Sequence, residues 1–132
     1  MALKAQFFNY DGMEAQSDAF HYSQTVKIGS IVKTSGQGGW DKQGNVPKDA
    51  AKQVDLVFSN ATLALQAADA SLSWRNVYAV RSYHTDLDET AGLVVEKFKQ
   101  LMPGHRVIFT CVEIRKLGIE GMKLEMEIEA CI

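Results

Sequence analysis

Acidic side chains near the C-terminus are the first candidates for chemistry in this chain of 132 residues. Glu125, Glu127 and Glu129 alternate with apolar residues, which predicts a β-strand whose three carboxylates share one face. A carboxylate held beside an electrophilic carbon can act as a general base, because it takes a proton from the attacking water. The same pattern is typical of a strand face that is exposed to solvent. From the spacing alone, the exposed face is the favoured interpretation.

Other reactive side chains give weaker signals. Cys111 shares a predicted strand face with Glu113, and a nearby carboxylate disfavours the thiolate, so an inert thiol is favoured over a nucleophile. Ser35 has no neighbouring base in a recognised motif, which argues against a serine nucleophile. The histidines are dispersed along the chain, and residues 36–39 lack the lysine of a phosphate-binding loop. We therefore expect no metal and no cofactor.

Charge and composition narrow the function classes. The chain carries 14 Lys and Arg against 16 Asp and Glu, its formal net charge is −2, and its basic residues are scattered. This distribution offers no patch for neutralising phosphates, so we expect no nucleic-acid partner. No apolar stretch approaches the length of a membrane span, and the N-terminus resembles neither a signal nor a transit peptide. These features predict one domain over residues 1–132, away from membranes and in the cytoplasm.

The two cysteines, Cys111 and Cys131, both fall within predicted strands. Reduced, partly buried thiols are the favoured interpretation for a cytoplasmic protein. Their spacing cannot decide whether a disulfide joins neighbouring strands.

Periodicity places two helices and several strands around these residues. Residues 49–68 carry one apolar helical stripe, and a second stripe over residues 91–101 ends at Pro103. Strands are predicted at residues 6–10, 26–28, 31–34, 77–85, 107–114 and 122–131. The resulting order β-β-β-α-β-α-β-β predicts an α+β two-layer sandwich in which two helices cover one face of a single sheet.

Four short segments together resemble the YjgF/Rid family of imine and enamine deaminases. They are Tyr22-Ser23-Gln24, Thr34-Ser35-Gly36-Gln37, FTCVEI at residues 109–114 and EIEA at residues 127–130. The resemblance covers roughly residues 20–132. It implies a YjgF/chorismate-mutase-like fold with one mainly antiparallel, six-stranded sheet and two helices on one face. It also implies a homotrimer that closes the open face of the sheet and holds small-molecule clefts between subunits.

The resemblance also implies roles for individual residues. Glu127 corresponds to the acidic residue that positions or activates the hydrolytic water. The other matching positions correspond to substrate-binding residues of the cleft, namely Tyr22, Ser35, Gly36, Gln37 and Cys111. The segment Gly38-Gly39-Trp40 departs from the family's usual continuation, which changes the loop beside the cleft.

Phe109 stands where the family usually has an arginine that binds a substrate carboxylate. Losing this charge-assisted contact removes about 1.5–3 kcal/mol, or roughly one to two decades in affinity. Arg106 lies an odd number of residues away and is predicted to point to the opposite face, and Arg115 lies about 20 Å further along an extended strand. Arg81 stays open as a residue that could replace the missing arginine. Either Phe109 packs at a subunit interface beside a vestigial cleft, or it lines a pocket repurposed for apolar ligands.

The predicted function is therefore a Rid-like enzyme for a small reactive imine, enamine or activated carbonyl compound. A neutral or apolar substrate suits Phe109 better than the imines of common amino acids. Two alternatives stay open: a metabolite-binding or chaperone-like trimer without catalysis, and an enzyme that uses the same cleft for cyclisation or dehydration. A nuclease is disfavoured by the charge distribution.

Overall fold

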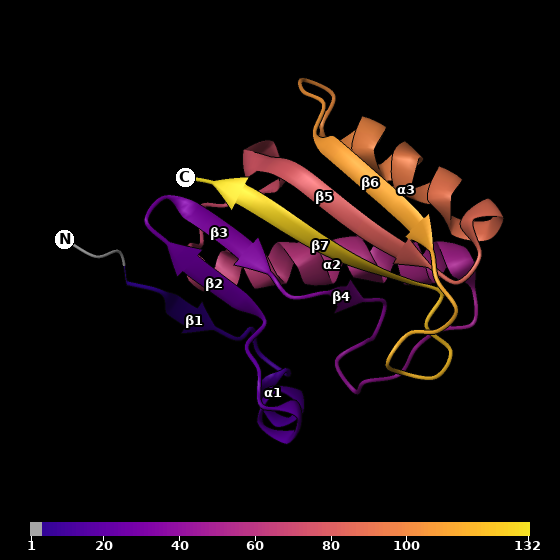
Figure 1. Ribbon diagram of the computed structural model, residues 1–132, viewed down its shortest axis with the longest axis horizontal. Helices are drawn as coiled ribbons and strands as arrows, with labels where there is room; N and C mark the ends of the chain where they lie inside the picture. The colour runs from indigo at the N-terminus through magenta and orange to yellow at the C-terminus, as the bar shows by residue number, and fades with distance from the viewer. Residues whose placement is uncertain (1–3) are drawn as a thin grey trace.

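The computed structural model describes residues 4–132. It contains one sheet and three α-helices (Figure 1). The strands are β1 (Gln6–Phe8), β2 (Thr25–Ile28), β3 (Ile31–Thr34), β4 (Gln37–Gly38), β5 (Val77–His84), β6 (Ile108–Glu113) and β7 (Leu124–Cys131). The helices are α1 (Glu14–Phe20), α2 (Ala50–Ala68) and α3 (Leu87–Leu101), and a 3₁₀ turn covers Trp74–Asn76.

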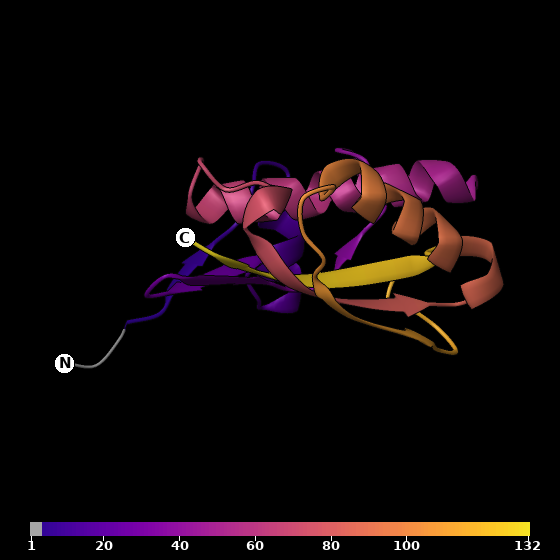
Figure 2. The same cartoon turned by 90° about the horizontal axis from the view of Figure 1, so that it is seen from above.

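The sheet has the order β1-β2-β3-β7-β5-β6, and the short strand β4 also pairs with β7. All pairs are antiparallel except β5 with β6, which are parallel. Helices α2 and α3 lie on the same face of the sheet (Figure 2). The predicted α+β fold with two helices on one face of a mainly antiparallel sheet is confirmed.

The structure contains two elements that the sequence pattern did not predict, helix α1 and strand β4. Helix α1 has only seven residues, which is too short for an apolar stripe to reveal it. Strand β4 has two residues inside a glycine-rich loop, where turn residues outnumber strand formers, and it brings the sheet to seven strands. Both elements help to build the candidate site, because α1 and β4 flank the segments that carry Tyr22 and Ser35.

The core lies between helix α2 and the central strand β7. The predicted helical stripe is buried at Val54, Val57, Phe58, Ala61 and Leu65. It packs with the alternate residues Leu124, Met126 and Ile128 of β7, which are fully buried. Asp49 caps the helix as expected, because its carboxylate accepts hydrogen bonds from the Ala51 and Lys52 amides. Burying this face of β7 forces Glu125, Glu127 and Glu129 onto the opposite, open face.

Strand β6 alternates in the same way at the edge of the sheet. Phe109 is aligned with Val80 of β5, a core residue that faces the helices. The side chains of Ile108 and Val112 therefore project from the open face, where they are 71% and 39% exposed. The structure thus places the predicted site residues on both faces of one sheet.

Candidate functional site

Three of the predicted site residues gather around one hollow of about 380 Å³, which we call the Tyr22 hollow. Tyr22, Ser35 and Gly36 form one side of it. The other lining residues are Gln16, Phe20, Trp40, Gly118, Ile119, Met122 and Glu125. The walls are mostly apolar or aromatic, and the polar groups are one carboxyl, one amide and two hydroxyls. Such a lining suits a small ligand with a planar body and a few polar atoms.

The phenol of Tyr22 is held by two amides. Gln16 Nε2 donates to the Tyr22 hydroxyl over 2.6 Å, and Gln24 Nε2 donates over 2.9 Å. Helix α1 supplies Gln16, and His21 ends the helix in a left-handed conformation with φ of 55°, which turns the chain into Tyr22. Because the hydroxyl oxygen accepts both bonds, its proton stays available for a ligand.

Gln37 lies behind this hollow and does not line it. Its side chain is fully buried, and its amide donates to Gln24 Oε1 over 2.8 Å and to the Ser35 carbonyl over 3.1 Å. Gln24 in turn holds Tyr22. In a single chain, Gln37 is therefore a positioning residue for Tyr22 and Ser35 and does not face a ligand.

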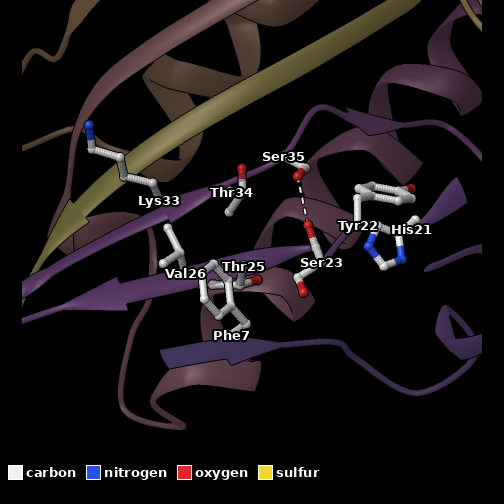
Figure 3. A pocket seen from close by; sticks show the side chains of 9 residues that line it. All are labelled: Phe7, His21, Tyr22, Ser23, Thr25, Val26, Lys33, Thr34 and Ser35. Atoms are coloured by element: carbon white, nitrogen blue, oxygen red, sulfur yellow. Dashed lines mark hydrogen bonds between the residues drawn. The ribbon is translucent and has the colours of Figure 1, made fainter. Parts of the chain in front are cut away.

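Ser35 lies between the Tyr22 hollow and a second hollow of about 470 Å³ along β2 and β3 (Figure 3). Its hydroxyl donates to the Ser23 carbonyl over 2.7 Å, drawn as the dashed line in Figure 3. Its amide donates to the Gln24 carbonyl over 2.8 Å. With its proton engaged by a carbonyl and no base beside it, the hydroxyl can accept a hydrogen bond from a ligand but is not set up as a nucleophile.

Glu127 belongs to a polar network on the open face of the sheet. Tyr83 donates its hydroxyl proton to Glu127 Oε1, and Arg81 Nε lies 3.7 Å from Glu127 Oε2. The bond to this carboxylate raises the pKa of Tyr83. Arg81 also binds Glu129 over 2.6 Å, and this contact lowers the pKa of Glu129. Both oxygens of Glu127 thus have a side-chain partner.

Glu125 is the carboxyl group that lines the Tyr22 hollow. Burial raises its pKa, and the negative charge of Glu127 adds to this effect. The sequence pattern does not distinguish Glu125 from Glu127 and Glu129, because the three glutamates alternate identically along the strand. Only their different surroundings distinguish them.

Phe109 and Cys111 lie on the helix side of the sheet, away from Glu127. The Phe109 ring packs against Phe98 of α3 with a centroid distance of 4.9 Å and an interplanar angle of 83°. Cys111 is aligned with Ser82, a buried residue on the same side. Glu127 is aligned with Arg81 and faces the other way. One chain alone therefore does not bring Phe109 and Cys111 together with Glu127 and Tyr22.

The prediction for Arg106 is wrong. Strand alternation was expected to direct Arg106 away from Phe109, but β6 begins only at Ile108. Arg106 precedes the strand, where alternation does not apply, and it lines the same hollow of about 510 Å³ as Phe109. The third candidate, Arg81, lies on the Glu127 side and is paired with glutamates.

The remaining reactive groups of residues 4–132 form no cluster that could act as a further site. His84 lies buried between the hydroxyls of Ser82 and Thr90, at 2.7 and 2.6 Å. Cys111 and Cys131 are free thiols. Within residues 4–132, no three His, Cys, Asp or Glu side chains come together as metal ligands. No helix in that part of the chain is both long and apolar enough to cross a membrane.

Comparison with known proteins decides the family. The family model described as endoribonuclease L-PSP matches residues 13–132. A solved structure of Escherichia coli TdcF with bound serine is 31% identical, with a TM-score of 0.74 over 84% of this chain and 87% of that chain. The chain belongs to the YjgF/Rid family.

Other YjgF/Rid structures agree in fold. RidA from an Antarctic Psychrobacter species is 28% identical, with a TM-score of 0.75 over 84% of this chain and 88% of that chain. A Mycobacterium tuberculosis member of the YjgF/YER057c/UK114 family is 24% identical, with a TM-score of 0.80 over 98% of this chain and 100% of that chain. Among curated protein sequences, none matches significantly. YjgF/Rid membership thus rests on the family model and on solved structures.

Proposed function

We propose that this chain is a Rid-like enzyme that hydrolyses a small reactive imine or enamine, or a similarly activated carbonyl compound, in a cleft between two copies of itself. The observation that carries the proposal is the division of the site residues between the two faces of the sheet. Tyr22 and Ser35 border the Tyr22 hollow, and Glu127 lies on the open face of β7, two residues from Glu125, which lines that hollow. Phe109 and Cys111 belong to the other face of the sheet. Two copies are needed to join the parts.

The homotrimer that the family resemblance implies is the proposed assembly. The open face of the sheet carries Ile108 and Val112, whose apolar side chains face solvent in a single chain. Covering them with a second copy is favourable, because burial removes apolar surface from water. The free thiols fit a reducing compartment, and we place the protein in the cytoplasm.

Imine hydrolysis needs only a few groups. An iminium carbon is already electrophilic, so the protein must orient a water molecule and accept its proton. Glu127 is the proposed general base, and Tyr83 and Arg81 fix the direction of its carboxylate. The Tyr22 ring forms a wall for the planar substrate, and its hydroxyl can donate a hydrogen bond.

Phe109 sets the substrate class in this proposal. Its ring ends an aromatic row in which Phe58 packs on Phe98 and Phe98 packs on Phe109. A carboxylate placed against this row would lose hydration without gaining a bidentate partner from position 109. TdcF, a relative, has been solved with serine bound, whereas neutral or apolar imines suit the present chain better.

A binding protein without catalysis is the second candidate. The observation that favours it is the occupied carboxylate of Glu127, since both oxygens already have partners in Tyr83 and Arg81. A base engaged in this way must give up part of a contact before it can bind water. A proton-transfer enzyme for cyclisation or dehydration would use the same groups. RNA hydrolysis is disfavoured, because the net charge is −2 and three glutamates line the open face.

Ammonia release from enzymatically generated imines tests the proposal. The panel should pair small carboxylated imines with neutral, bulkier imines, each corrected for spontaneous hydrolysis. We expect turnover of neutral imines and slow or absent turnover of carboxylated ones. No release from any imine in the panel would reject hydrolysis, and tight binding without release would support the binding protein.

A further inference from the structure

In the part of the chain that the structure describes, Glu125 differs from the other two glutamates of β7, because its carboxyl has no side-chain or backbone partner. Glu127 contacts Tyr83 and Arg81, and Glu129 contacts Arg81, Tyr78 and Lys33. Across residues 4–132, the Glu125 carboxyl takes part in no hydrogen bond and no ion pair. It is therefore the carboxyl of this row that can contact a ligand without giving up part of an existing contact.

The carboxyl of Glu125 faces the Tyr22 hollow. It lies directly over the backbone of Gly36, where an added Cβ would come within 1.8 Å of Glu125 Oε1. The absence of a side chain at Gly36 thus opens the space that the carboxyl occupies. Ser35 and Tyr22 border the same hollow, so the carboxyl and two hydroxyls can reach one small ligand.

The surroundings of Glu125 suit a group that carries a proton. Phe20, Trp40, Ile119 and Met122 line the same hollow and supply no positive charge. The titratable groups nearby are Tyr22 in the hollow, Glu127 on the same strand face, and Tyr83, which is aligned with Glu125 on the neighbouring strand β5. Burial and the charge of Glu127 both raise the pKa of Glu125. Glu127, in contrast, contacts the Tyr83 hydroxyl and the Arg81 guanidinium. One carboxyl in an apolar hollow and a second one held by polar partners is a usual arrangement for an acid and a base.

Geometry allows the two glutamates to act on one substrate. Residues two apart on a strand share a face and lie about 7 Å apart along it. A C=N group placed between them can direct its nitrogen toward one carboxyl and leave its carbon open to a water held by the other.

We propose that Glu125 is a second catalytic residue, which donates a proton to the imine nitrogen while Glu127 takes a proton from the attacking water. This inference rests on the proposed function and names the acid of the same site. It adds a group that none of the sequence matches assigned.

The protons and electron pairs balance over one cycle. Glu125 protonates the nitrogen, water adds its oxygen lone pair to the carbon, and the C=N π electrons move to nitrogen as Glu127 takes the water's proton. Glu127 then protonates the amine nitrogen, and Glu125 recovers a proton from the carbinol hydroxyl as the C–N bond breaks. The products are a carbonyl compound and ammonia, and both glutamates return to their starting states.

The pH dependence of ammonia release tests this role. A general acid must be protonated, so wild-type turnover should fall as pH rises through the raised pKa of Glu125. Glu125→Gln cannot donate a proton. It should lower kcat by about 100-fold or more and lose the alkaline decline. Gly36→Ala should lower kcat and remove the alkaline decline in the same way, because the added Cβ displaces the Glu125 carboxyl from its position without removing it. Glu120→Gln, an exposed glutamate outside the hollow, is the control and should keep the wild-type profile.

Circular dichroism and native mass spectrometry should show that each variant folds and assembles. A Glu125→Gln protein with the wild-type rate and the wild-type alkaline decline would overturn the inference, while the proposed function would stand. A wild-type protein that releases no ammonia from any imine would overturn both. A loss of rate in Glu125→Gln with the alkaline decline intact would reduce Glu125 to a structural residue and would also overturn the inference.

Discussion

Glu127→Gln is expected to lower imine turnover by about 100- to 10,000-fold and to leave ligand binding within a few-fold of the wild type. The amide keeps the size of the side chain and can still accept the Tyr83 hydrogen bond, but it cannot take a proton from water. Arg81 keeps its 2.6 Å contact with Glu129, so the open face should stay ordered. Ammonia release measures turnover, and calorimetry with a non-hydrolysable ketone measures binding.

The control for this substitution is again Glu120→Gln, which removes the same charge from an exposed position. Unchanged turnover in a folded Glu127→Gln protein would remove Glu127 from the proposed mechanism. It would also favour a reaction in which Glu125 acts alone.

Phe109→Arg is expected to raise kcat/KM for carboxylated imines by roughly 10- to 100-fold. A guanidinium at this position can bind a carboxylate through two hydrogen bonds, which the phenyl ring cannot do. The substitution also removes the edge-to-face contact with Phe98, at a cost of about 0.5–1.5 kcal/mol in the free energy of unfolding. Phe109 is only partly buried at an edge strand, so the fold should tolerate this loss.

Phe109→Gln is the matched control, because it removes the ring and adds a polar group without a charge. If kcat/KM for carboxylated imines rises with arginine and not with glutamine, the rise comes from charge-assisted binding of the carboxylate. No gain in a Phe109→Arg protein that folds and assembles would count against an intact hydrolytic site. If the wild type already turns over carboxylated imines, Arg106 is the first residue to test as the missing cation, since it lines the Phe109 hollow.

Much of the fold follows from local pattern. The alternation of β7 predicted which residues face the helices, because burial of Leu124, Met126 and Ile128 leaves the intervening glutamates no other side. Helix α2 was predictable because nineteen residues repeat its apolar stripe and Asp49 marks its start. Helix α1 was not predicted, because seven residues are too few to show a helical repeat of apolar side chains.

The site was harder to predict, because its properties depend on residues that are distant in the sequence. Arg106 was misplaced because strand alternation was extended two residues beyond the strand's real beginning. Glu125 could not be distinguished from Glu127 and Glu129, because periodicity treats the three glutamates alike. Only the pairing of β5 with β7, which brings Arg81 and Tyr83 to Glu127 and leaves Glu125 free, separates their roles.

Subunit mixing tests the central claim, which is that each cleft joins residues from opposite sheet faces of two copies. One parent is Glu127→Gln, and the other is Cys111→Trp, whose indole should fill the β6 side of the cleft. Each parent is expected to be nearly inactive. In trimers reassembled from equal amounts of both, roughly a quarter of the clefts receive two intact parts, so about that fraction of wild-type ammonia release should return. Mixed trimers verified by native mass spectrometry that stay as inactive as their parents would contradict the claim.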